Sequence, residues 1–395
     1  MLDTLKALLR APERKQSRTS RLIAIESGGR ARWTPRDYAA LTREGYTKNA
    51  IVHRAVRLIA ESVGGISFLL QEGAAEHAAH PLLDLIARPN PRQDGAAFLE
   101  SVASHLLLAG NAYVEAVSLD GEGASNVREL YALRPDRMKV VPGPDGWPQG
   151  FDYTVAGHTV RFEQAAAQPP ILHLTLFNPL DDYYGLSPLE AAATAVDTHN
   201  AAAKWNKALL DNAARPSGAL VYAGAEGAVM ADAQFERLKK ELGDQYAGTA
   251  NAGRPMLLEG GLDWKAMSLS PKDMDFMEAK HSAAREIALA FGVPPMLLAI
   301  PGDNTYSNYA EANRVFWRGS VLPLANRIGA ALTQWLAPSF GAGLSLVADA
   351  DKIEALSADR AALWERVTKA PFLTVNEQRA ATGYGAVAGG DTFGS

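Results

Sequence analysis

Residues Phe291 to Asn308 read FGVPPMLLAIPGDNTYSN, and the rest of the chain is organised around this stretch. Its three prolines and two glycines exclude a continuous helix, because proline lacks a backbone N–H and clashes with the preceding turn. The segments on both sides have helical apolar spacing. The sequence therefore predicts a loop between two helices. The apolar middle, Met296 to Ile300, is unusual for a surface connection, so we expect another surface to cover it.

The composition is that of a mildly acidic globular protein. The 395 residues are 47% hydrophobic and 21% charged, with a formal net charge of −5. Proteins that bind DNA phosphates tightly usually show a clustered excess of Lys and Arg, so we expect any DNA contact to be weak, sliding or repulsive. Cys is absent, which excludes disulfides and thiol chemistry. The start MLDTLKALLRAPERK lacks the apolar core of a signal peptide, and we expect a soluble intracellular product.

The first half of the chain predicts an arm followed by an α+β domain. Residues 1–45 are mixed and basic, which favours an arm. From residue 46 to 186, helical and strand patterns alternate. Helices are expected from Asn49 to Gly64 and from about Gly95 to Leu108, and strands are expected between and after them.

The second half predicts long helices around a small insert. The sequence Ser187-Pro-Leu-Glu is a capping box that opens a helix over 187–214, and Ser270-Pro-Lys-Asp opens another over 270–291. The insert between them, 215–269, indicates a small α+β unit. After the loop of 292–308, a helix that is kinked at Pro323 and a strand are expected over 309–350. Residues 351–395 form the C-terminal region, whose Gly-rich end is expected to be disordered from about Ala388.

The sequence offers little catalytic chemistry. His77 and His80 have the spacing of two metal ligands but lack a third one nearby, so we predict no metal site there. His105 and His173 lie in apolar segments and are predicted to be satisfied core or interface histidines. Asp181-Asp182 favours a turn. The chain has no phosphate-binding loop, dinucleotide fingerprint or nucleophile elbow. We therefore predict no enzyme and no catalytic or cofactor site.

Five segments in order resemble the portal proteins of tailed bacteriophages, including those of phage-like gene transfer agents. The resemblance extends from about Asn49 to Gly390, and it is greatest for the compact class of portals. The segments are HPLLDLIARPNPRQDGAAFLESVASHLLLAGNAYVE (80–115), ELYALRPDRMKVV (129–141), HLTLFNPLDDYYGLSPLEAA (173–192), FGVPPMLLAIPGDNTYSNYAEANRVFWRGSVLPL (291–324) and LTVNEQRAATGYGAVAGGD (373–391).

This resemblance implies a ring of twelve subunits at one capsid vertex of a virion or virion-like particle. The ring would be the channel for double-stranded DNA during packaging and ejection. Its expected partners are further copies of itself, DNA without sequence specificity, the large terminase subunit, a head–tail adaptor and the major capsid protein. The family architecture implies a wing (46–186 and 309–350), stem helices (187–214 and 270–291), a clip (215–269), a tunnel loop (292–308) and a short crown with the tail (351–395).

The resemblance also implies roles for three sets of residues. The tip of the tunnel loop would approach DNA, although a plain turn is the alternative: Asp303, Asn304, Thr305 and Tyr306. The apolar middle of the loop would pack on the adjacent subunit: Met296, Leu297, Leu298 and Ile300. The clip would present a surface to partners, although a solvated helix face is the alternative: Glu226, Asp232, Glu236, Arg237, Lys240 and Asp244.

Two other functions stay open at this point. One is an intracellular α+β hydrolase that uses Asp181, Asp182 and His173. The other is a non-portal head–tail connector ring. The sequence also leaves open which charged side chains of the stem face the bore.

Overall fold

The computed structural model describes residues 33–118, 127–166, 168–211, 218–222, 262–266, 276–301 and 306–392, together with the single positions 233, 236, 237 and 240. The chain divides into a first unit, Met1–Trp33, and a second unit, Thr34–Ser395, to which the following description applies. The expected N-terminal arm lies mostly outside the described residues. Helix α2 (Tyr38–Glu44) falls within its predicted range, and its Leu41 is buried in the core.

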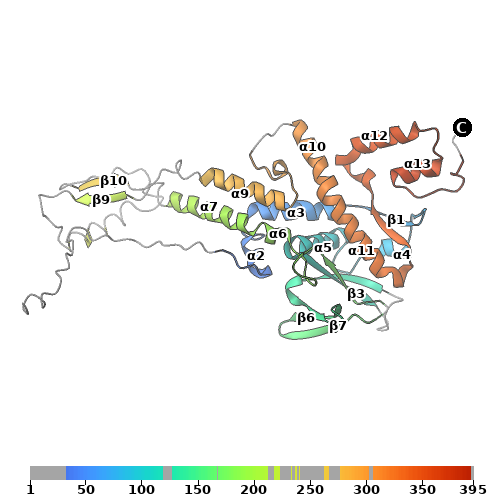
Figure 1. Ribbon diagram of the computed structural model, residues 1–395, viewed down its shortest axis with the longest axis horizontal. Coiled ribbons are helices and arrows are strands. Elements are labelled where there is room, and N and C mark those ends of the chain that lie inside the picture. Colours follow the sequence, from blue (N-terminus) through green and yellow to red (C-terminus); the bar gives the residue numbers. More distant parts are fainter. Residues whose placement is uncertain are drawn as a thin grey trace, which may run out of the picture. The chain divides into compact units, whose positions relative to one another are not determined.

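The centre of the fold is a pair of packed helices, α3 (Ala50–Gly64) and α5 (Gly95–Ala109), as the apolar spacing predicts (Figure 1). Each helix begins at a side chain that accepts backbone N–H groups, Asn49 for α3 and Asp94 for α5. Gly110 ends α5 in the left-handed conformation with φ of 71°. The shorter helix α4 (Pro81–Ala87) precedes α5 and starts at His80, whose ring accepts the Leu82 N–H.

Three small antiparallel sheets accompany these helices. The first contains β4-β3-β8 and the second contains β5-β6-β7. The third has the order β11-β1-β2, so it joins the start of the folded unit to a strand near its end. The bounds are β1 (Phe68–Glu72), β2 (Ala75–His77), β3 (Asn111–Ser118), β4 (Val127–Leu133), β5 (Met138–Pro142), β6 (Pro148–Val155), β7 (His158–Glu163), β8 (Ile171–Thr175) and β11 (Leu344–Ala348). The α+β character that the sequence predicts is confirmed.

The helix predicted over 187–214 is divided into two. The short α6 (Pro188–Ala191) starts at Ser187, whose side chain accepts the Glu190 N–H at 3.0 Å. This is the Ser187 half of the expected capping box. After a break at Ala192, α7 (Ala193–Asp211) continues and packs along α9 (Phe276–Ala290), as Figure 1 shows. Within the insert, strands β9 (Gly218–Tyr222) and β10 (Leu262–Ala266) pair in antiparallel fashion.

Where the sequence predicts a kink at Pro323, the long helix that follows the loop has a π-helical turn just before this residue. Helix α10 (Tyr306–Phe316) passes through a π-helical turn at Trp317–Val321 into α11 (Leu322–Phe340). Pro323 has no N–H to donate to the Gly319 carbonyl four residues earlier. The Leu322 N–H donates instead to the Trp317 carbonyl, five residues back, so the strain is relieved by a wider turn.

The C-terminal region is ordered further than the sequence predicts. Helices α12 (Ser357–Thr368) and α13 (Val375–Thr382) follow two short 3₁₀ turns, and Thr374 and Glu377 form a capping box at the start of α13. The predicted disorder from Ala388 is wrong for residues 388–392. The Asn376 N–H donates to the Gly390 carbonyl at 2.8 Å, and its side chain donates to Asp391 at 2.7 Å. Long-range hydrogen bonds of this kind leave no composition signal.

Candidate functional site

Helices α7 and α9 pack together, and both bury small side chains that we call the alanine seam. Ala195 and Ala202 of α7 are buried, as are Ala283 and Ala284 of α9. Because alanine extends little beyond the backbone, the two helix axes can approach closely along this seam. The larger apolar residues of α9 differ in exposure. Ile287 is fully buried, whereas Leu289 is 80% exposed. The pair therefore has one face packed on the core and one face open to contacts.

A polar junction fastens the base of this pair to α3. Asn49 uses its side-chain oxygen to accept the N–H groups of Ile51 and Val52 at 3.0 and 3.2 Å. Its amide nitrogen donates to Asn200 Oδ1 at 2.9 Å and lies 3.1 Å from His199 Nδ1. His199 must therefore accept at Nδ1, and burial, followed by nearby Lys280 and His281, lowers its pKa. Sequence reasoning located the helix start but missed this junction.

The loop that follows α9 is clamped at both ends of its described part. Gly292 has φ of 66°, and its carbonyl accepts the Ser320 hydroxyl at 2.6 Å from the π-helical turn. At the other end, the Arg285 guanidinium of α9 donates to the Pro301 carbonyl. Between them, Pro295–Leu298 forms a 3₁₀ turn that ends at Ala299 with φ of 55°. The base of the loop is thus held by the helices on each side of it.

The structure shows what covers the apolar middle of the loop. Leu298 and Ile300 are 7% and 3% exposed and belong to the hydrophobic core of their own chain. Met296 and Leu297 are only partly buried, and Leu297 packs against the same core. Only Met296 and Leu297 keep side-chain surface for a contact with a neighbour. The predicted packing of all four residues on an adjacent subunit stays a prediction.

Most of the other predicted site residues lie outside the described residues. At the loop tip, these are Asp303, Asn304 and Thr305, whereas Tyr306 is the first residue of α10. In the clip, they are Glu226, Asp232 and Asp244. The remaining clip residues Glu236, Arg237 and Lys240 are helical and exposed. The roles assigned to these two sets stay predictions.

His105 and His173, the two histidines that the sequence places in apolar segments, are half-buried. His173 Nε2 lies 3.0 Å from Asn111 Oδ1, and its ring stacks on Tyr113 with a centroid separation of 4.3 Å. Burial lowers the pKa of His173 to about 4 and does the same to the pKa of His105. Both imidazoles are therefore neutral at pH 7. Among the described residues, His105 Nδ1 lacks the hydrogen-bond partner that a satisfied histidine would have.

The acidic pair forms the turn that the sequence predicts. Asp181 Oδ1 accepts the N–H groups of Tyr183 and Tyr184 at 2.8 and 3.0 Å. This carboxylate is thus engaged with backbone donors of its own turn. The two histidines with metal-ligand spacing have other partners. His77 Nε2 lies 3.0 Å from Glu72 Oε2, and His80 Nδ1 accepts the Leu82 N–H at the start of α4. Within the described ranges, no three His, Asp or Glu side chains gather to form a metal site.

Comparison with known protein families shows to which family this chain belongs. The model of the phage portal protein family matches residues 50–383, which include α3, the α7 and α9 pair, the loop and α13. The chain therefore belongs to the phage portal protein family. Over the part of the chain that the structure describes, no helix is long and apolar enough to cross a membrane.

Within this family, the chain is similar to a protein of gene transfer agent particles. The neck of an empty particle, solved with C6 symmetry, contains a chain that is 52% identical, with a TM-score of 0.71 and coverage of 93% of this chain and 100% of the other. The neck of a native particle, solved with C12 symmetry, contains one that is 51% identical, with a TM-score of 0.69 and coverage of 91% and 97%.

A curated relative supports the same assignment at greater distance. The portal protein of Enterobacteria phage HK97 is 25% identical over 325 residues, which cover 79% of this chain and 72% of that protein. The mixed helix and sheet architecture is thus the portal fold, and the family match favours the portal interpretation over the hydrolase and the non-portal ring.

Proposed function

We propose that twelve copies of this chain form a ring at one vertex of a phage-like or gene transfer agent particle, with a central channel through which DNA passes. The observation that carries this proposal is the neck of a native gene transfer agent particle with C12 symmetry, because its matching chain is 51% identical and is covered over 97% of its length. Subunits this similar are expected to assemble through the same surfaces.

In this ring, the α7 and α9 pair forms the stem, and the loop of 292–308 approaches the channel. Two features support this assignment. The alanine seam makes the pair slender and close-packed, and the clamps from Ser320 and Arg285 give the loop a fixed base. A rigid base is what a loop needs if its tip is to contact DNA at a defined radius.

The chain carries out this role without catalysis, as a conduit and a docking platform. The insert of 215–269, which contains β9 and β10, is the clip that receives the large terminase subunit and the head–tail adaptor. The wing contacts the major capsid protein. The net charge of −5 suits a channel, because a strongly basic bore would retain the DNA that must slide through it.

Single-particle measurement of the purified chain tests the proposed function. Mass photometry should show an assembly of twelve 42.2 kDa subunits, and negative-stain images should show a ring with an open centre. Because portal subunits can stay monomeric until assembly starts, the measurement is repeated after concentration and in the presence of capsid protein. A compact monomer under every condition, or a closed particle without a channel, would contradict the proposal.

A further inference from the structure

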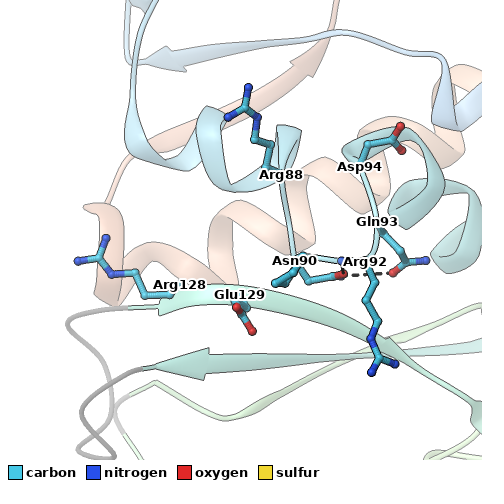
Figure 2. Close-up of a pocket in the computed structure, with 8 residues that line it drawn as sticks. Arg88, Asn90, Arg92, Gln93, Asp94, Arg128 and Glu129 are labelled. Atoms are coloured by element: carbon cyan, nitrogen blue, oxygen red, sulfur yellow. Dashed lines mark hydrogen bonds between the residues drawn. The ribbon is translucent and has the colours of Figure 1, made fainter.

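A shallow pocket of about 530 Å³ opens between the turn that follows α4 and the start of β4 (Figure 2). Three arginines contribute to its lining, Arg88 and Arg92 from the turn and Arg128 from the strand. All three are exposed. We call these three residues the arginine surface.

The turn that carries two of these arginines is rigid and is fastened to the strand that carries the third. Pro89 and Pro91 restrict the backbone on both sides of Asn90. Asn90 is 8% exposed, and its side-chain amide donates to the Leu130 carbonyl of β4 at 2.9 Å. In return, the Leu130 N–H donates to the Pro89 carbonyl at 2.7 Å. The arginine surface therefore has a preorganised base.

Among the residues that the structure describes, none accepts a hydrogen bond or forms an ion pair with the side chains of the arginine surface. The two carboxylates of the pocket have other donors. Asp94 accepts the Ala97 N–H at 2.8 Å to cap α5, and Glu129 accepts the Tyr131 hydroxyl at 2.8 Å. Within the described ranges, three positive charges are thus left for an external anion.

The directions of the side chains decide the kind of anion. Figure 2 shows that Arg88, Arg92 and Arg128 point away from one another. One small anion cannot reach all three groups, whereas an extended polyanion can contact each in turn. A guanidinium forms paired N–H bonds to phosphate, and duplex DNA offers phosphates at regular spacing along both strands.

We propose that the arginine surface binds the phosphates of duplex DNA that lies against the outside of the portal, in addition to the DNA in the channel. This inference rests on the proposed function, which brings DNA to the protein and assigns these residues to the wing. The pocket carboxylates and the negative net charge keep the binding weak and sensitive to salt. Weak contacts suit DNA that must be released during ejection.

A closed DNA circle separates this surface from the channel, since a circular duplex cannot be threaded through a ring. Binding of a labelled minicircle of about 300 bp, roughly twice the persistence length of DNA, is measured by fluorescence anisotropy between low and physiological salt. The variant R88A/R92A/R128A should bind at least tenfold more weakly at low salt. Its plot of log affinity against log salt should be less steep by about 2.7, or about 0.9 for each lost contact.

The matched control R54A/R134A/R161A removes the same total charge. Its three arginines are also exposed, but they are paired with Glu61, Asp136 and Asp152. This control should bind the minicircle as the wild type does. If the triple variant misfolds by circular dichroism, the single variant R128A should still reduce the slope by about 0.9.

Three results would overturn the inference. The first is an equal loss of DNA binding in the control and in the triple variant, and the second is unchanged DNA binding in the triple variant. The third is a chain that does not bind the minicircle but binds poly-L-glutamate through the three arginines, which would assign the surface to an acidic protein segment. Mass photometry of the same samples keeps the proposed function separate, because a failure of ring assembly appears there independently of DNA binding.

Discussion

Single side chains decide how this fold responds to pH. His173 is held between Tyr113 and Phe151, and its Nε2–H donates to Asn111 Oδ1 in the neutral form. Its pKa falls to about 4 because burial penalises the charged imidazolium. In the unfolded chain, a histidine is protonated near pH 6.5. Between these two values the unfolded chain binds more protons, so stability decreases as the pH falls from 6.5 to 4.

Replacement of His173 with Gln should make the stability of the chain less dependent on pH. For the wild type, this one residue lowers the free energy of unfolding by about 2 kcal/mol between pH 7 and pH 5. In His173→Gln, this pH-dependent decrease in the free energy of unfolding should be absent. The free energy of unfolding at pH 7 should also be lower by about 1 to 2 kcal/mol, because the ring contacts disappear. Urea unfolding of the monomeric chain at both pH values measures this. His158→Gln, at an exposed site on β7, is the control. The same pH dependence in His173→Gln and the wild type would contradict the burial argument.

The loop between α9 and α10 shows how one element constrains another. Pro323 produces the π-helical turn, and a side chain of that turn, Ser320, donates to the Gly292 carbonyl at 2.6 Å. Gly292 has φ of 66°, and a Cβ atom there would lie 2.8 Å from Ser320 Oγ. Glycine is therefore favoured at the base of the loop, first by the backbone conformation and second because a Cβ atom would displace the Ser320 hydroxyl from its hydrogen bond.

Two glycine-to-alanine variants test this dependence. Gly292→Ala should destabilise the chain by about 1 to 3 kcal/mol, through a strained backbone and a displaced hydroxyl. Gly319→Ala lies in the same structural neighbourhood, but a Cβ atom there meets no atom within 4 Å. It should be neutral or stabilising by up to about 1 kcal/mol, because alanine favours a helix. Urea unfolding at pH 7 compares the two variants, and equal effects would mean that the clamp does not hold the loop.

The whole assembly depends on surfaces that a single chain leaves open. In the proposed ring, each subunit offers two different faces to its neighbours, and the insert of 215–269 is the proposed docking site for other proteins. Strands β9 and β10 pair with each other in register from Gly218 with Ala266 to Tyr222 with Leu262. This pairing does not involve residues 225–250. A deletion of that segment should therefore leave the strand pair and the stem intact.

Deletion of residues 225–250 should abolish binding of the terminase or the adaptor while rings still form. The expected loss is complete, because the segment contains all six residues proposed to contact the partners. Co-sedimentation of rings with each purified partner measures binding, and mass photometry confirms assembly. A milder variant, E236A/R237A/K240A, changes three exposed helical residues and should weaken binding by about tenfold if they are central to the contact. Full partner binding by the deleted chain would show that the clip is elsewhere.

The sequence by itself determined those structural elements whose cause lies in a few neighbouring residues. The caps at Asn49 and Ser187, the turn at Asp181 and the irregularity at Pro323 all depend on residues within about five positions, so their chemistry can be recognised without a fold. The ordered segments that resemble portal proteins also led to the family, which the match over residues 50–383 establishes.

Only the tertiary structure decided which distant residues meet. The hydrogen bond from Asn49 to Asn200, the pairing of β1 with β11 and the fastening of Asn90 to β4 join segments about 40 to 280 positions apart. Packing of the core fixes such contacts, and no short pattern encodes them. The same limit explains the loop of 292–308. Its proline break follows from the backbone chemistry of a few residues, whereas the cover over Leu298 and Ile300 comes from helices that only the folded chain brings together.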